Sequence, residues 1–304
     1  MSESPEDDLL SSVLNAYQLR AGVYGHPRLC GIWQMGTSGH KRAAFHLVGR
    51  GNCWLHLRGD RAPEPLQGGD LVVFPHDTWH MLSGTPTLQG EENLMPEAAE
   101  GPFTTLVCGY FEFQAGDKNP ILDALPEVIV VRREQAGRHL EIIGQLLLEE
   151  AQGESIGTRT VLDKLADTLF VMVVRQYISQ MSDQRGLLAA LADARLRKAL
   201  AAVHRDLATP WTLEGLAQIA GMSRASFAQK FSELVGTTPI DYLTRWRMTQ
   251  AELMLRDPQI SVASAAERVG YETEAAFRKA FKRVHGVGPG SIRRWFRGKL
   301  NSAH

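Results

Sequence analysis

Side chains that could read nucleic-acid bases recur in two similar stretches near the C-terminus. The first stretch contributes Arg224, Gln229 and Lys230, and the second contributes Arg278, Lys279 and Lys282. Arginine and lysine form hydrogen bonds with guanine edges and also bind phosphates, and glutamine forms hydrogen bonds with adenine. The chemistry that these residues predict is recognition of double-stranded nucleic acid.

A second group of reactive side chains lies in the N-terminal half. His46, His80 and Cys108 occur in or next to apolar runs, and His40 is a further candidate. Imidazole and thiolate together suit zinc, so a metal site of His46, His80 and Cys108 is one interpretation. The alternative is that the histidines are hydrogen-bonded pocket residues and Cys108 is a small buried apolar residue. His56 alternates with apolar neighbours and is expected at the surface.

The basic stretches lie in two copies of one helical unit. The recurring pairs are Ala217 and Ala266, Gly221 and Gly270, Phe227 and Phe277, Phe231 and Phe281, Gly236 and Gly286, and Pro239 and Pro289. The first glycine of each copy supplies a left-handed turn, and Ser223 and Thr273 are placed to cap the second helix. The phenylalanine pair at i and i+4 forms a buried stripe. This pattern predicts helix-turn-helix units at 213–235 and 262–285.

The stretch from about Arg197 to Arg294 resembles the C-terminal DNA-binding domain of AraC/XylS-type transcription regulators. The similarity rests on segments 236–243, 247–255, 265–271, 277–282 and 288–289. One departure is Ile292, where the family usually has an aromatic residue. The resemblance implies an all-α domain at 194–298, in which a linker helix joins two helix-turn-helix units.

Position within the family motif also implies which residues face the bases, namely Arg224, Ala225, Ala228, Gln229, Glu274, Ala275, Arg278 and Lys279. The basic residues Lys230, Lys282 and Arg293 complete the predicted DNA-binding set.

The region before this domain has a different pattern of apolar and turn-forming residues. Between residues 23 and 131, short apolar or alternating runs are separated by Gly, Pro and Asp, which predicts an all-β barrel or sandwich. Segments 43–51 and 69–80 resemble the two cupin motifs, so residues 1–133 are similar to a cupin-type effector-binding domain. Catalytic cupins commonly bind a metal with three histidines and a glutamate. Those positions fall on Ser38, His40, Ala44 and His80, so two of the four ligands are missing.

Residues 134–193 change to a helical period and are predicted to form a dimerisation region and linker. The two helices are apolar on more than one side; a dimer interface and purely intramolecular packing are both open. Residues 182–193 are expected to be a short connector, and 84–102 a mobile loop.

Charge is divided unevenly along the 304 residues. Residues 195–304 carry 18 Lys and Arg against 9 Asp and Glu, whereas the preceding 194 carry 15 against 25. A basic C-terminal third is the electrostatic signature of a nucleic-acid-binding domain. No signal peptide or membrane-spanning run is recognised. The three cysteines lack CxxC spacing and are odd in number, which indicates reduced thiols. A cytoplasmic protein is therefore expected.

These observations predict a multidomain regulator: an N-terminal cupin barrel with following helices, and a C-terminal helical DNA-binding domain. The expected partners are promoter DNA, a small effector near His40, His46 and His80, a second copy of the chain, and RNA polymerase if it activates. Zinc is the only cofactor indicated, and only if its three ligands meet. Two alternatives stand beside this hypothesis: a cupin metalloenzyme (oxygenase or isomerase) with an appended helical domain, and an architectural DNA-binding protein without a ligand.

Overall fold

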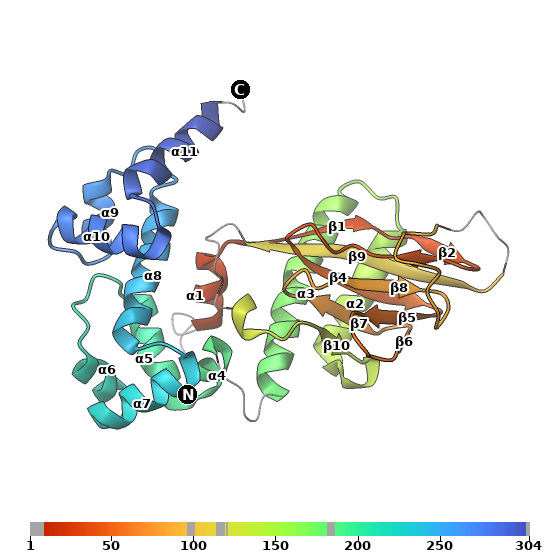
Figure 1. Ribbon diagram of the computed structural model, residues 1–304, viewed down its shortest axis with the longest axis horizontal. Helices are drawn as coiled ribbons and strands as arrows, with labels where there is room; N and C mark the ends of the chain where they lie inside the picture. Colours follow the sequence, from red (N-terminus) through yellow and green to blue (C-terminus); the bar gives the residue numbers. More distant parts are fainter. Residues whose placement is uncertain (1–8, 96–100, 114–118, 120, 181–185, 302–304) are drawn as a thin grey trace. The chain divides into compact units, whose positions relative to one another are not determined.

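The computed structural model describes residues 9–95, 101–113, 119, 121–180 and 186–301. These residues form two compact units. The sheet unit comprises 19–112 and 125–180, and the helical unit comprises the described residues of 1–18, 113–124 and 181–304 (Figure 1). The predicted division into a β-rich and a helical part is confirmed.

The sheet unit contains two antiparallel sheets. One has the order β1-β9-β4-β7-β10, with β2 paired to β9, and the other has the order β3-β8-β5-β6. The strands are β1 (Leu19–Gly25), β2 (Arg28–Cys30), β3 (Gln34–Met35), β4 (Ala43–Arg50), β5 (Asn52–Leu57), β6 (Glu64–Gln67), β7 (Leu71–Phe74), β8 (His80–Ser83), β9 (Phe103–Phe113) and β10 (Ile129–Val131).

Strand β4 is buried on both faces. Its even-numbered residues Ala44 and Val48 join the apolar cluster between the sheets, and His46 points to the same side because side chains alternate along a strand. On the other side Phe45 stacks on Phe111 at 4.8 Å between ring centroids, and Phe111 meets Phe170 at 4.7 Å. The strand therefore separates a space between the sheets from a layer of helices.

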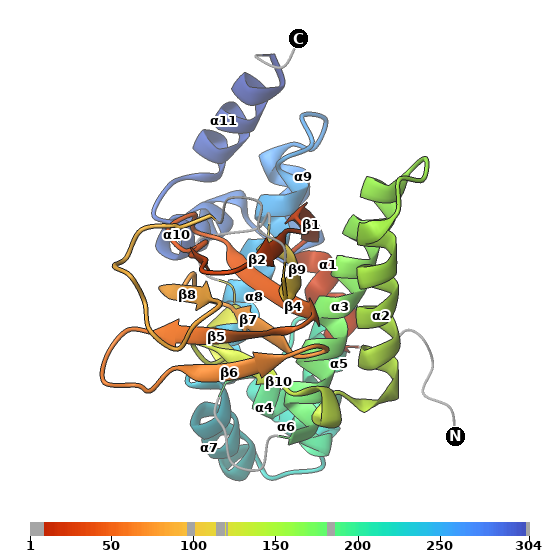
Figure 2. The ribbon, with the colours of Figure 1, turned by 90° about the vertical axis from the view of Figure 1, so that its right-hand side faces the viewer.

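Two long helices form that layer, as the helical period predicts. They are α2 (Gly137–Gln152) and α3 (Thr158–Gln180), preceded by the 3-10 turn η3 (Arg133–Gln135). The helices pack side by side against one face of the sheet unit (Figure 2). On α2, Ile142 and Leu146 lie one turn apart and are 41% and 44% exposed.

The helical unit confirms the predicted pair of helix-turn-helix units. Its elements are α1 (Leu9–Ala16), η2 (Leu122–Ala124), α4 (Leu187–Ala192), α5 (Ala194–Arg205), α6 (Leu213–Ile219), α7 (Arg224–Val235), α8 (Pro239–Met254), α9 (Val262–Arg268), α10 (Glu274–His285) and α11 (Pro289–Asn301). Helices α6 and α7 form the first unit, and α9 and α10 form the second. Between them, α8 is the predicted linker helix.

Two segments differ from expectation. Residues 187–192, expected as connector, form helix α4, which packs against α5 and α7; residues 182–185 lie outside the described residues. Helix α1 packs on α5 and α8 of the helical unit, and the rings of Tyr17 and Trp246 lie 6.1 Å apart. By these contacts α1 belongs to the helical unit, although its sequence position assigned it to the cupin-like domain.

The expected mobile loop at 84–102 is partly anchored, and 96–100 lie outside the described residues. Gln34 pairs with Leu94 through backbone hydrogen bonds of 2.9 and 2.8 Å, and its side-chain amide donates to Gly90 O at 3.2 Å. Among the described helices, none is long and apolar enough to cross a membrane.

Candidate functional site

Helices α7 and α10 are built in the same way. Ser223 Oγ accepts a hydrogen bond from Ser226 N at 3.2 Å, and Thr273 Oγ1 accepts one from Ala276 N at 3.3 Å. Each helix ends at a glycine in the left-handed region, with φ of 77° at Gly236 and 74° at Gly286. Both predicted caps and both predicted ends are therefore present.

The buried phenylalanine stripe decides which face of each helix is free. Phe227, Phe277 and Phe281 are fully buried and Phe231 nearly so. The opposite face carries most of the sequence-predicted DNA contacts. Those exposed are Arg224, Ala225, Gln229, Ala275, Arg278, Lys279 and Lys282, and those half-buried are Ala228 and Glu274.

Two of these side chains are held within their own helix. Gln229 Nε2 donates to Glu233 Oε1 at 2.8 Å, and Arg278 Nε donates to Glu274 Oε1 at 2.6 Å. Exposed pairs four residues apart contribute only about 0.3–0.5 kcal/mol. Glutamine and arginine can therefore exchange these partners for base edges at little cost.

Lys230 and Arg293 differ from the rest of the predicted set, because each of them contacts another segment of the helical unit. Lys230 Nζ pairs with Asp193 Oδ2 at 2.5 Å, and the Asp193 carboxylate also caps α5. Arg293 Nη2 donates to Pro258 O at 2.7 Å. The structure therefore gives both side chains a role in holding helices together.

Arg247 of the linker helix binds the loop that precedes the first helix-turn-helix unit. Its Nε donates to Leu207 O at 2.9 Å and its Nη2 donates to Thr209 O at 2.7 Å. The turn of the second unit lies against the same loop, since a Cβ placed on Gly270 would be 2.7 Å from Ala208 O and 2.9 Å from Arg247 Nη2. The 207–209 loop, the linker helix and the turn of the second unit thus meet at one place.

The second candidate site is an open cavity of about 260 Å³ in the sheet unit. Its lining consists of Tyr24, Gly36, Thr37, His40, Arg42, Ala44 and Tyr110. Thr37 Oγ1 connects the cavity to two buried histidines, at 3.1 Å from His46 Nε2 and 3.0 Å from His80 Nε2. The structure therefore brings the three predicted effector-site residues to one place, with His40 on the exposed rim.

Hydrogen bonding fixes the tautomers of the buried histidines. His80 Nδ1 lies 2.7 Å from Thr78 O, so Nδ1 carries the proton and Nε2 accepts. His46 Nε2 lies 3.1 Å from His80 Nε2 and must be the donor. Burial lowers the pKa of His46 well below its usual range and that of His80 to about 4, so both rings are neutral near neutral pH.

Comparison with known proteins follows the same two-part division. A cupin family profile matches residues 8–179, more than half of the chain, and a helix-turn-helix domain profile matches residues 216–294. A putative AraC-like transcription regulator of Streptomyces antibioticus is 31% identical over 301 residues, covering 94% of this chain and 98% of that protein. The chain belongs to the AraC-like transcription regulators.

Other relatives carry similar names. An uncharacterized helix-turn-helix-type transcriptional regulator of Haemophilus influenzae is 31% identical over 300 residues, covering 94% of this chain and 98% of that protein. The DNA-binding domain of AdpA, solved in complex with a target DNA, is 31% identical, covers 35% of this chain and 96% of its own, and has a TM-score of 0.33. This AraC-like chain is accordingly a DNA-binding transcription regulator with a cupin-like N-terminal domain.

The three donors predicted for zinc all lie in the sheet unit of this AraC-like regulator. Among the described residues, no three His, Cys, Asp or Glu side chains are grouped to hold a metal ion. Cys108 lies opposite His46 in the β4–β9 register, but it belongs to the apolar cluster between the sheets. Burial raises the pKa of its thiol. The zinc site at His46, His80 and Cys108 stays a prediction.

Several site residues of this AraC-like chain were missed by sequence reasoning. Thr37 and Arg42 carry no motif, although Thr37 is adjacent to Ser38, a position that the cupin motif pointed to. Arg247 lies among ordinary helix residues, and only the fold shows what its guanidinium reaches. His56, expected at the surface, is 8% exposed and its Nε2 lies 2.7 Å from Ser83 Oγ.

Proposed function

We propose that this regulator inserts α7 and α10 into successive major grooves of promoter DNA. We also propose that a small effector controls its activity by binding in the 260 Å³ cavity lined by Thr37, hereafter the Thr37 cavity. The observation that carries the DNA part is the close packing of Gly270 against the 207–209 loop, to which Arg247 of the linker helix also donates hydrogen bonds; it supports a fixed spacing of the two helix-turn-helix units. Helix α8 has 16 residues, so at about 1.5 Å per residue it spans roughly 24 Å. With the widths of its neighbours, this supports a separation near one turn of DNA, about 34 Å.

Specific base contacts are assigned by exposure and chemistry. Arg224 and Gln229 of α7 would read guanine and adenine edges, and Arg278 and Lys279 of α10 would do the same in the next groove. The exposed alanines offer apolar contact to thymine methyl groups. Lys282, on the last turn of α10, suits a phosphate.

The effector part rests on the composition of the Thr37 cavity. Arg42 and the rings of Tyr24 and Tyr110 surround a space that is small and partly polar. Ala44 stands where a metal-binding cupin has its glutamate, so binding rather than metal-dependent catalysis is the function that this cavity supports. Relatives that match nearly the whole chain are named as regulators, which supports the same choice over the enzyme alternative.

We further infer that the regulator acts as a homodimer in the cytoplasm, where its DNA target lies. Ile142 and Leu146 form an exposed apolar stripe on α2, a surface that a second copy could cover. A dimer would place two DNA-binding domains, each with two helix-turn-helix units, on one promoter. If the regulator activates transcription, RNA polymerase is a further partner.

Footprinting of the full chain on a DNA site selected from a random library tests the DNA part. Protection of two groove segments about 10 base pairs apart by each chain is expected. Arg278→Ala should lose discrimination only in the segment that α10 contacts, whereas Arg224→Ala should lose it in the other. Protection of a single groove segment per chain would refute the bipartite arrangement.

A thermal-shift screen of small metabolites on the full chain tests the effector part. A true effector should stabilise the wild type and fail to stabilise Thr37→Val, which keeps the side-chain volume and removes the hydroxyl. The variant should keep its footprint without the effector. Equal stabilisation of both proteins would place the effector elsewhere.

A further inference from the structure

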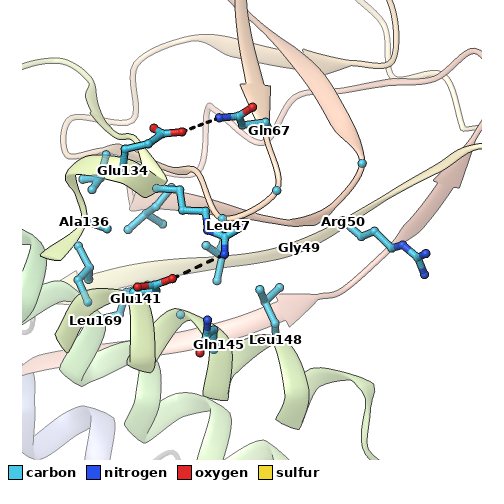
Figure 3. A pocket seen from close by; sticks show the side chains of 18 of the residues that line it. Leu47, Gly49, Arg50, Gln67, Glu134, Ala136, Glu141, Gln145, Leu148 and Leu169 are labelled. Carbon is cyan, nitrogen blue, oxygen red and sulfur yellow. Dashed lines mark hydrogen bonds and ion pairs between the residues drawn. The ribbon is translucent and has the colours of Figure 1, made fainter. Parts of the chain in front are cut away.

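A second, larger cavity of about 540 Å³ lies on the opposite side of strand β4. It opens between the β4–β5 turn, the β6–β7 turn, η3 and helix α2 (Figure 3). Its apolar lining consists of Leu47, Leu71, Val131, Ala136, Leu140, Leu148 and Leu169. A space of this size and lining is in the range that holds a small organic molecule.

The four charged side chains of the lining already have partners. Arg133 Nη2 lies 3.7 Å from Glu141 Oε1, and Glu134 Oε1 accepts a hydrogen bond of 3.0 Å from Gln67. Arg50 lies over the Phe103 ring and points away from the cavity (Figure 3). These pairs lie at the exposed edge of the cavity, whereas its apolar lining offers a buried charge no partner, so a ligand seated against that lining is best uncharged.

Two lining amides remain for hydrogen bonding. Among the described residues, the side chains of Asn52 and Gln145 have no hydrogen-bond partner, and both are exposed at the edge of the cavity. An amide can donate to and accept from a hydroxyl or carbonyl group without adding charge. The complementary ligand is apolar over most of its surface and carries one neutral polar group.

Gly144, in the middle of α2, shows that the cavity is not filled although a side chain would fit. A Cβ at this position would lie 3.7 Å from Leu47 Cδ2, an ordinary contact distance. Glycine inside a helix costs about 1 kcal/mol relative to alanine. Neither a left-handed backbone nor close packing requires glycine here, and the space left free is the cavity itself.

We propose that this cavity is a ligand site for an uncharged lipophilic molecule with a single hydrogen-bonding group. It is separate from the Thr37 cavity, because Leu47 and Ala44 project from opposite faces of β4. The ligand would contact the Gly144 face of α2, while Ile142 and Leu146 lie on the outward face of the same helix. The proposal does not depend on the effector assigned to the Thr37 cavity.

A matched pair of fluorescent probes tests the site on the purified full chain. N-phenyl-1-naphthylamine is uncharged, and 8-anilinonaphthalene-1-sulfonate has the same ring skeleton with a sulfonate. Saturable one-to-one binding of the uncharged probe is expected, with the sulfonate probe binding at least about tenfold more weakly. Equal binding of the two probes, or no saturable binding of the uncharged one, would overturn the proposal.

Two filling variants locate the bound probe. Gly144→Leu fills the proposed site and should weaken binding of the uncharged probe at least about tenfold. Ala44→Leu fills the Thr37 cavity instead and should leave that affinity within about twofold. The reverse pattern, or no change in either variant, would overturn the assignment. If Gly144→Leu does not fold, Gly144→Ala serves in its place, and an unchanged affinity there would count against the site.

Discussion

The contact at Gly270 allows one prediction to be worked out with a matched control. Gly270 has φ of +78°, and an added Cβ would lie 2.7 Å from Ala208 O and 2.9 Å from Ala208 Cα. Gly221 is the equivalent position of the first helix-turn-helix unit; its φ is +62°, and a Cβ there would have no described atom within 4 Å. The two alanine variants therefore share the backbone strain and differ in the collision.

The magnitudes follow from these two contributions. Alanine in the left-handed region costs about 1–2 kcal/mol, which both variants should lose from the free energy of unfolding. Gly270→Ala must also move backbone atoms of the 207–209 loop, which adds about 1–3 kcal/mol. It displaces the Arg247 guanidinium that bonds to Thr209 O as well. The total for Gly270→Ala is about 2–5 kcal/mol.

Urea unfolding and DNA-binding titrations with the full chain measure both effects. Gly221→Ala should lower the unfolding midpoint modestly and keep the affinity of the folded protein for its two-groove site. Gly270→Ala should lower the midpoint further and weaken binding to the two-groove site more than to a site with one groove segment, because the spacing of α7 and α10 changes. Equal midpoints and equal affinities for the two variants would show that the loop contact does not set the spacing.

Three further predictions follow from the side chains described above. Gln229→Ala should cost about 1–3 kcal/mol at one base pair, seen as relaxed selection at that position, and equal losses on specific and random DNA would show a phosphate contact instead. Buried His80, with its pKa near 4, should contribute a loss of about 1.4 kcal/mol of stability per pH unit as the pH falls from about 6.5 to 4, because the unfolded chain binds a proton there that the folded chain does not, and buried His46 adds a loss of the same sign. Acid unfolding that is no shallower in His80→Gln would contradict this. Leu146→Glu should convert the dimer to a monomer in light scattering while the exposed control Glu149→Gln does not, and a dimeric Leu146→Glu protein would move the interface off α2.

The helical unit was readable from sequence because local signals determine it. Ser223, Thr273, Gly236 and Gly286 act within one turn of their own helix, so type and spacing predict the caps and ends. The same holds for the Phe227 and Phe277 stripes, whose period of four residues needs no knowledge of the partner surface. Exposure of the recognition face then follows from burial of the opposite one.

The site in the sheet unit depends on contacts between distant residues and was only partly readable. The alternation along β4 placed His46 on the face of Ala44, but nothing in the sequence shows that Thr37 bridges His46 and His80. The register places Cys108 opposite His46, although the sequence shows neither this pairing nor the apolar cluster around the thiol. Lys230 and Arg293 show the same limit, since a basic residue on a recognition unit can equally pair with an aspartate or a carbonyl.

Helix α1 has a consequence for building hybrid regulators. The helical unit is discontinuous in sequence: it takes α1 from the start of the chain, the segment before 125 from the middle, and everything after 180. In this chain the rings of Tyr17 and Trp246 lie 6.1 Å apart. A chimera that exchanges only the C-terminal part with a relative would place a foreign α8 against the original Tyr17. Grafts that carry residues 9–17 together with the C-terminal part should keep that surface matched, so a working hybrid needs one junction after residue 17 and a second one before the C-terminal part.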